Sequence, residues 1–391
     1  MKGTLQQSMA WLHTWAGLLL GWFMFVIFTT GTAAYFQEEI TEWMQPELHG
    51  AADPDKAAAD AIAYLQETAP DARSWFITLP NDRRTMTSVF WQPSGEGQPR
   101  SQTSATLNTD GAPLDIRETR GGFFLYRFHF DLHYMPVIWA RYLVGIATMS
   151  MLVAILSGIV THKKIFADFF MLRLGKGQRS WLDAHNMSAV FALPFFVMIT
   201  YTGLVTLGTQ YMPWGVAANY SQQNTYFAEK FPFFTGEEAT GIRTALAPIE
   251  PMLQFTRQEW DGAGPGFISI TNPGDETATV TLTRALDAAV SARGPSMIFS
   301  GSDGTLVRRS PGNGAGVETE GVMIGLHAGR YAKPGLRWLY FLSGVVGTIM
   351  VGSGLVLWTV KRRLRLKNPD KPHFGFMLVE RLNIGVIVGL N

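Results

Sequence analysis

The chain has 391 residues, of which 47% are hydrophobic and 13% are aromatic. Only 16% are charged, against about 25% in an ordinary soluble domain, and this composition argues against most soluble folds. Cysteine is absent, which excludes disulfides, cysteine-ligated zinc, iron–sulfur clusters and haem attached through a C-x-x-C-H motif. A bound metal ion would therefore be held by His, carboxylate, Met or Tyr side chains.

Four long apolar segments predict a membrane protein. Each reaches the ~20 residues that a helix needs to cross a bilayer. A cleaved signal peptide is the alternative for the first segment, but its apolar region is too long and no small-x-small cleavage site follows it. We therefore expect four transmembrane helices, at residues 9–36, 138–161, 187–211 and 337–360.

The charges between these segments predict the orientation. With the N-terminus inside, the segments 1–12, 162–183 and 361–391 carry a net charge of +9, and the rest of the chain carries −8. Positive charge beside helix ends marks the cytoplasmic side. We therefore expect a cytoplasmic loop at 162–186 and a cytoplasmic C-terminal segment at 361–391. The overall charge of +1 hides this asymmetry, and we expect no nucleic-acid partner.

The chain repeats itself. In the first and third predicted helices a His stands 18 residues before a Gly, and in the second and fourth an Arg stands 17 residues before a Gly. Both halves begin inside, so they are parallel repeats about an axis along the membrane normal. The matching pairs are His13–Gly31, His185–Gly203, Arg141–Gly158 and Arg337–Gly354.

The two outside segments, 37–137 and 212–336, also match each other. Each contains an amphipathic helix followed by short alternating strands, with an Asp-Gly turn at Asp110-Gly111 and at Asp303-Gly304. The expected fold is thus an integral membrane protein, mainly α, with four transmembrane helices in two parallel repeats and two small α+β domains outside. Neither domain contains a nucleophile elbow, a phosphate loop or an HExxH motif.

Six of the eight histidines fall at predicted helix ends. An ionisable residue in a membrane segment marks a candidate functional site, although a lone interfacial His more often just bonds headgroups or loops. Two groups at opposite faces favour two non-covalent, b-type haems, with zinc or copper on three His as the alternative. The inner group is His13, His162 and His185, and the outer group is His129, His133 and His327; only His49 and His373 lie elsewhere.

The repeat suggests how the histidines pair. His13 and His185 are equivalent, so both are expected to ligate the inner haem iron, with His162 as the rival ligand. His327 corresponds roughly to His129 or His133, which stand four residues apart and would share a helical face; we expect His129 and His327 as outer iron ligands.

Two arginines near the outer group are expected to bind the propionates of the outer haem. Arg141 and Arg337 would do so through charge-assisted hydrogen bonds. The alternative is that they merely extend to the membrane interface.

Several stretches resemble the PepSY-associated transmembrane family. They are WLHTWAGLLLGWFMFVIFTTG, FHFDLHYMPVIWARYLVGI, LSGIVTHKKIFADFFMLRLGKGQRSWLDAHN and ITYTGL. The resemblance covers nearly the whole chain and extends to FoxB-type ferric-siderophore reductases. It implies PepSY-like outside domains in the periplasm, a bacterial inner-membrane location, and His ligands at His13, His129, His162, His185 and His327. The third helix reads LPFF at Phe196, where the family often has LPFH, and longer members continue past this C-terminus.

The function that this reading implies is electron transfer across the membrane. Electrons from an unidentified cytoplasmic or membrane donor would reduce a ferric siderophore in the periplasm, and its iron would leave as Fe(II). The alternative is a membrane-anchored PepSY periplasmic binding or sensor protein without redox activity. A transporter is disfavoured because the predicted helices lack Asp, Glu, Lys and Arg at mid-membrane.

Overall fold

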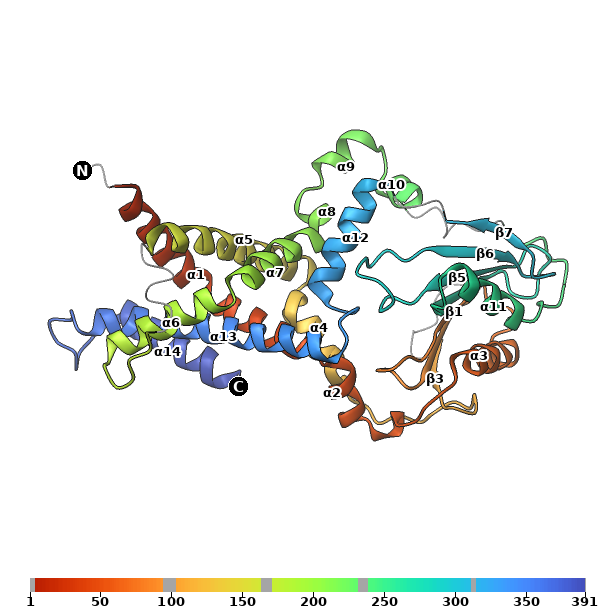
Figure 1. Ribbon diagram of the computed structural model, residues 1–391, viewed down its shortest axis with the longest axis horizontal. Helices are drawn as coiled ribbons and strands as arrows, with labels where there is room; N and C mark the ends of the chain where they lie inside the picture. Colours follow the sequence, from red (N-terminus) through yellow and green to blue (C-terminus); the bar gives the residue numbers. More distant parts are fainter. Residues whose placement is uncertain (1–3, 94–102, 163–170, 231–237, 311–313, 391) are drawn as a thin grey trace. The chain divides into compact units, whose positions relative to one another are not determined.

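The computed structural model describes residues 4–93, 103–162, 171–230, 238–310 and 314–390. The chain folds into two compact units, each made from segments that are far apart in the sequence (Figure 1). The helical unit comprises residues 1–37, 122–212 and 326–391, and the sheet unit comprises 38–121 and 213–325.

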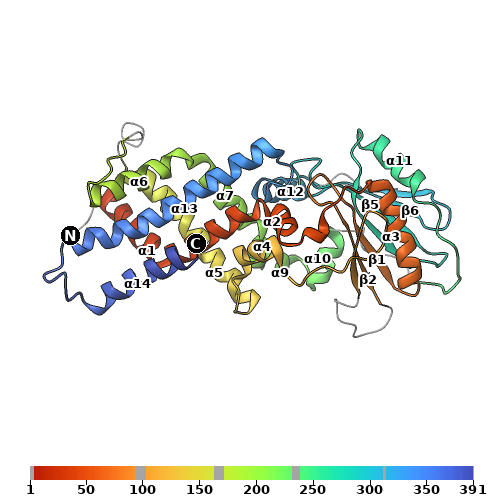
Figure 2. The same cartoon turned by 90° about the horizontal axis from the view of Figure 1, so that it is seen from below.

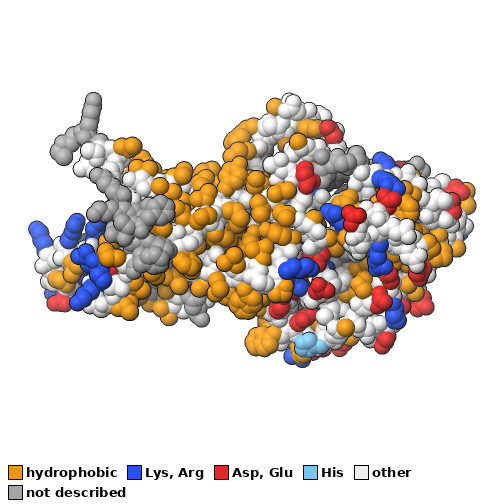
Figure 3. All heavy atoms as spheres, in the orientation of Figure 1, with side chains coloured by type: hydrophobic (Ala, Val, Ile, Leu, Met, Phe, Trp, Pro, Cys, Tyr) orange, Lys and Arg blue, Asp and Glu red, His pale blue; other side chains and the backbone are white. Residues whose placement is uncertain are grey.

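The helical unit contains the membrane-spanning candidates. Three helices are long and apolar enough to cross a bilayer, and a bent pair makes a fourth if it counts as one span. Figure 3 shows hydrophobic side chains over most of the visible face of this unit, as a lipid-facing surface requires. The helices are α1 (Leu5–Ala34), α4 (Gly121–Asp131), α5 (Val137–Thr161), α6 (Gln178–Phe191), α7 (Leu193–Thr206), α8 (Gly208–Tyr211), α13 (Pro334–Arg363) and α14 (Phe374–Gly389). Helix α12 (Ala315–Ala328) begins in the sheet unit, and its last residues, with His327, belong to the helical unit.

The third predicted helix needs correction. Instead of one helix over 187–211, the structure has α6 and α7, which are bent by 70° relative to each other. The break falls at Ala192, and Pro194 stands in the first turn of α7. Proline lacks the N–H that would continue the hydrogen-bond ladder of α6, and its ring clashes with the preceding turn. Helix α6 begins at Gln178, so His185 lies within a helix rather than in the loop expected at 162–186.

The helices of the two repeats pack both within each half of the chain and between the halves. Within the halves, α1 packs on α5 and α6 packs on α13; between the halves, α1 packs on α13 and α7 packs on α5. Small residues permit the close approach: a Cβ added to Gly21 would lie 2.8 Å from a methyl carbon of Leu355. The parallel repeat in the sequence is therefore matched by equivalent helix–helix contacts in the two halves.

The C-terminal segment at 361–391 contains a helix, α14, for which we made no prediction from the sequence. Asn383 anchors it, because its amide oxygen accepts from Trp22 Nε1 at 2.8 Å and its amide nitrogen donates to the carbonyl of Leu355 at 2.9 Å. Asn383 is 4% exposed, and a buried amide of this kind is stable only when it is paired. The segment is thus part of the helical unit and packs on α1 and α13.

The sheet unit has one seven-stranded sheet with strand order β3-β2-β1-β4-β5-β6-β7. Its strands are β1 (Ser74–Thr78), β2 (Thr87–Gln92), β3 (Ser104–Leu107), β4 (Pro265–Thr271), β5 (Thr279–Arg284), β6 (Ser296–Ser300) and β7 (Leu306–Arg309). Its helices are α2 (Gln37–Met44), η1 (Pro46–Leu48), α3 (Pro54–Thr68), α9 (Trp214–Asn219), α10 (Gln223–Lys230) and α11 (Glu250–Glu259).

Both outside segments contribute to this one sheet, whereas we expected two separate domains. Strands β1 and β4, one from each segment, pair antiparallel with Ile77 opposite Ile268. Helices α3 and α11 pack against the sheet (Figure 2), and both isoleucines are fully buried beneath them. Each segment alone would leave an unpaired edge at β1 or β4, and joining the edges satisfies both.

A buried carboxylate holds the turn after β4. Asp275 accepts hydrogen bonds from the N–H and hydroxyl of Thr277, from Gly241 N–H and from the Thr240 hydroxyl. These bonds favour the charged form and hold the pKa of Asp275 well below its usual range. A depressed pKa contributes stability above the unfolded-state value of about 3.9, and that stability is lost as the pH falls through the folded-state value.

We therefore expect Asp275→Asn to lower the melting temperature of the sheet unit at pH 7, and the difference from wild type to shrink at pH values below about 4. Calorimetry of the full chain across this pH range measures both effects. Glu276→Gln is the matched control, because Glu276 is exposed beside it. An equal difference at pH 7 and pH 3 would contradict the assignment.

Candidate paired-histidine sites

Two histidine rings from the two halves of the chain lie face to edge within the helical unit. His13 of α1 and His185 of α6 have ring centroids 6.1 Å apart and planes at 67°. His13 Nδ1 lies 2.8 Å from the carbonyl oxygen of Ala154 in α5, and His185 Nδ1 lies 2.8 Å from that of Met350 in α13. Each ring is thus oriented by a helix other than its own.

A second pair repeats this arrangement. His129 of α4 and His327 of α12 have ring centroids 6.0 Å apart. His129 Nδ1 lies 2.8 Å from the carbonyl oxygen of Ile27 in α1, and His327 Nδ1 lies 3.0 Å from that of Ile199 in α7. The equivalent of His327 in the first half is therefore His129, a choice that the sequence spacing left open.

A glycine lies against every one of these four rings, four residues after the carbonyl that bonds it. A Cβ built on Gly354 would lie 3.0 Å from ring atoms of His185, and one built on Gly203 would lie 2.9 Å from His327. A larger residue would displace the ring from its carbonyl. The four glycines are Gly158 for His13, Gly31 for His129, Gly354 for His185 and Gly203 for His327.

The residue before each of these glycines is Ser or Thr, whose hydroxyl donates to a carbonyl of its own helix. These residues are Thr30, Ser157, Thr202 and Ser353. The sequence reasoning used the glycine spacings to detect the repeat but missed their contact with the histidines. Four Ser/Thr-Gly dipeptides within apolar helices were the available signal.

The hydrogen bonds determine which ring nitrogen is available. A carbonyl oxygen can only accept, so each Nδ1 carries the proton. In the described part of the chain the Nε2 atoms of the four rings make no hydrogen bond. An Nδ1–H bonded to a carbonyl is the usual outer-shell partner of a metal-binding imidazole. Each ring is thus in the tautomer that presents Nε2 as a ligand.

The spacing of the rings suits two ligands of one ion. An imidazole nitrogen binds a metal ion at about 2.0–2.1 Å and lies about 1.1 Å from the ring centre, so the centroids of two imidazoles that bind one ion lie at most about 6.3 Å apart. The observed separations are 6.1 and 6.0 Å. No group of three or more His, Asp or Glu with metal-binding geometry occurs among the described residues.

A cavity of about 840 Å³ opens beside the His13–His185 pair. Small residues line it one turn after each histidine, namely Gly17 and Ala189, as expected for a flat ligand. A Cβ built on Gly17 would meet nothing within 4 Å. His162 also lines this cavity, so it lies with the pair, although it is not the residue facing either ring.

His133 does not share a helical face with His129, which corrects our expectation. Helix α4 ends at Asp131, and Leu132 has a positive φ of 42° that redirects the chain. The His133 ring contacts Phe124 and Tyr134 instead. His133 therefore lies outside both pairs, as do His49 after η1 and His373, the N-cap of α14.

The two predicted propionate arginines already have protein partners. Arg141 Nε donates to Asp131 Oδ1 at 2.8 Å, and Arg127 pairs with the same carboxylate. Arg337 is 9% exposed and donates to the carbonyl of Ala332 at 3.2 Å. The structure thus gives both side chains a role in holding the starts of α5 and α13.

The tautomers can be tested directly. We expect His13, His129, His185 and His327 to carry their proton on Nδ1 in the chain without bound metal. ¹⁵N NMR of histidine-labelled protein distinguishes the two tautomers. His373 is the internal control, because its Nδ1 accepts from the Phe376 N–H at 3.2 Å and must therefore be unprotonated. An Nε2–H signal from the four paired rings would refute the orientation.

Comparison with known proteins places this arrangement in a family. The chain is 25% identical over 272 residues to the uncharacterized protein PA4219 of Pseudomonas aeruginosa, and the alignment covers 64% of this chain and 65% of that protein. Residues 10–361 match the PepSY-associated TM region, a span that includes all four paired histidines. The chain therefore belongs to the PepSY-associated TM region family of membrane proteins.

Proposed function

We propose that this chain is a two-haem reductase of the bacterial inner membrane, which passes electrons across the membrane to a ferric siderophore in the periplasm and releases iron as Fe(II). The observation that carries the proposal is the repeated histidine pair. Two pairs of imidazoles, one ring from each half, have their Nε2 atoms available and their ring centroids at 6.0–6.1 Å.

The residues present fit haem. His13 and His185 would hold one haem, and His129 and His327 would hold the other. With no cysteine in the chain, both haems would be non-covalent and b-type. The cavity beside His13 and His185 is mostly apolar, and its volume of about 840 Å³ is in the range of cofactor sites. Bound haem supplies one-electron transfer at a potential set by its ligands and surroundings.

The protein's own part is to position the two sites and to exclude water. On α1, His13 belongs to one site and Gly31 to the other; 18 residues of helix separate them by about 27 Å along the axis. Phe196 of α7 is fully buried in the helical core and lies 6.0 Å, ring to ring, from Phe28. A packed apolar interior of this kind lowers the local dielectric constant and keeps both sites dry.

The proposed orientation of the protein in the membrane rests on the distribution of charge. The +9 and −8 split favours a cytoplasmic N-terminus, which would place the sheet unit and the His129–His327 pair toward the periplasm. A ferric siderophore is the proposed acceptor, since reduction weakens the hold of hard oxygen ligands on iron. The donor would be a cytoplasmic or membrane-bound reductant.

One observation favours a second function. The sheet unit has its own cavity of about 340 Å³, whose lining includes Glu38, Glu42, Arg84 and Arg117. A pocket with both signs of charge suits a membrane-anchored PepSY-like binding or sensor protein without redox activity. The visible absorption spectrum of the purified protein separates the two functions, because only the reductase would show Soret and α bands.

We expect two haems per chain, both removed by acid–acetone. His13→Ala or His129→Ala should each lower the ratio of haem to protein from about two to about one, because each change removes one of the two histidines that would hold a haem and leaves a cavity in its place. The pyridine haemochrome assay measures the ratio. His133→Ala and His373→Ala are matched controls that should keep both haems, and a wild-type ratio near one would rule out transmembrane transfer through two haems.

Topology gives an independent check. In this cysteine-free chain, Lys176→Cys should be protected from a membrane-impermeant maleimide in intact spheroplasts, while Glu276→Cys should react, since both residues are exposed. The expected ratio of labelling is at least tenfold, because a bilayer excludes a charged reagent. The reverse pattern would place the sheet unit in the cytoplasm.

A further inference from the structure

We propose that Lys361, Arg362 and Arg365 form a cationic rim that binds the propionate carboxylates of the haem held by His13 and His185, and that α14 holds this rim in place. The inference rests on the proposed function. The positive charges at the start of the segment 361–391, which indicate its orientation, would then also form part of a binding site in the helical unit.

The three cations line the same cavity as the two histidines. No Asp or Glu is among the described residues that line this cavity, and the three side chains make no ion pair with any described residue. Lys361 and Arg365 are exposed and Arg362 is half-buried, so their charges remain hydrated when the cavity is empty. An anion at the cavity mouth would gain charge-assisted hydrogen bonds from them.

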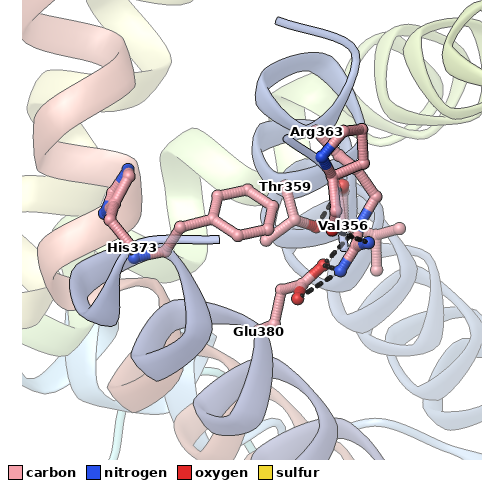
Figure 4. Close-up of polar contacts among 7 residues, drawn as sticks. Val356, Thr359, Arg363, His373 and Glu380 are labelled. Carbon is pink, nitrogen blue, oxygen red and sulfur yellow. Dashed lines mark hydrogen bonds and ion pairs between the residues drawn. The ribbon is translucent and has the colours of Figure 1, made fainter. Parts of the chain in front are cut away.

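The neighbouring arginine on α13 behaves differently. Arg363 points to α14 and binds both carboxylate oxygens of Glu380, at 2.8 Å to Oε1 and 2.7 Å to Oε2 (Figure 4). The cations at the end of α13 therefore have two different surroundings. Arg363 attaches the last turn of α13 to α14, and Lys361, Arg362 and Arg365 remain for the cavity.

Aromatic contacts fix the turn further. Phe376 of α14 is 1% exposed and stacks with Trp358 at a centroid distance of 6.5 Å and an interplanar angle of 21°. The Arg362 guanidinium lies 3.8 Å from the centroid of the same indole, within the range of a cation–π contact. Trp358 itself lines the cavity. Helix α14 thus orients the rim without entering the cavity.

The shape and charge of the cavity match an amphipathic dicarboxylate. Gly17 and Ala189 offer a flat apolar wall near the histidines, and the cations stand where α13 ends. A haem would place its ring on the wall and its carboxylates on the rim, through charge-assisted hydrogen bonds to Arg and Lys. A lipid phosphate offers similar chemistry, so the test must separate the two anions.

The test removes charge from the rim and, separately, from the ligand. In a His327→Ala background, which leaves the cavity site as the intact one, full-length protein from a haem-deficient host is titrated with protohaem and with its dimethyl ester in phosphatidylcholine nanodiscs. Lys361→Ala/Arg365→Ala should weaken protohaem binding about 10- to 100-fold by the Soret band. The same variant should bind the ester as the parent does.

Matched variants separate charge from structure. Arg381→Ala, an exposed cation of α14 outside the cavity, should leave both affinities unchanged, and Arg365→Lys should retain most of the protohaem affinity. Glu380→Gln, which releases Arg363, should weaken protohaem binding by a smaller factor than the double variant does.

Three results would contradict the proposed role of the cationic rim. Equal loss of protohaem and ester binding would show a structural effect, and unchanged protohaem binding in the double variant would show that the rim does not touch the propionates. Competition by phosphatidylglycerol, with no difference between haem and ester in the parent, would assign the rim to lipid phosphate. Absence of a Soret band even in the wild-type chain would overturn the proposed function itself.

Discussion

The architecture of the helical unit depends on one interaction made four times, the hydrogen bond from a histidine Nδ1–H to a carbonyl oxygen of a neighbouring helix. In an apolar interior this bond is strong and its loss is costly. It fixes the ring, sets its tautomer and requires a glycine one turn further along the accepting helix. The spacing of the helices, the positions of the small residues and the pairing of the rings all follow from it.

Each of these hydrogen bonds joins two helices of the same half, and the two halves become one unit through the ring pairs and the packing of α1 on α13 and of α7 on α5. Each long helix of one half presents a carbonyl to a histidine and also packs on the other half, so neither half can place a ring pair alone. The sheet unit follows the same logic with different chemistry, because β1 and β4 complete each other's edges. In both units the two duplicated segments complete each other, by ring pairs in the helical unit and by backbone hydrogen bonds between β1 and β4 in the sheet unit.

The two histidine pairs are similar in geometry and differ in surroundings. The His13–His185 pair has a third histidine, a cavity and three cations beside it, whereas the arginines that follow the second pair in sequence are held by Asp131 and by a backbone carbonyl. If the proposed cofactors are bound, the nearby cations would favour the electron-rich form of the one at the His13–His185 pair, so the two sites would differ in potential.

The sequence by itself determined the membrane class, the positions of three spanning helices and the repeat, because apolar length and residue spacing are local properties of the chain. It also singled out the histidines and glycines that meet in the structure, since their spacing records the helix length between two sites. Only the tertiary structure decided that His129 rather than His133 faces His327, because a single positive φ at Leu132 ends the helix between them. The bend at Ala192 has a local cause in Pro194, which the sequence reasoning missed. The single sheet and the place of α14 were tertiary outcomes. They depend on contacts between segments more than 100 residues apart, such as Trp22 with Asn383, and no local pattern records a partner at that distance.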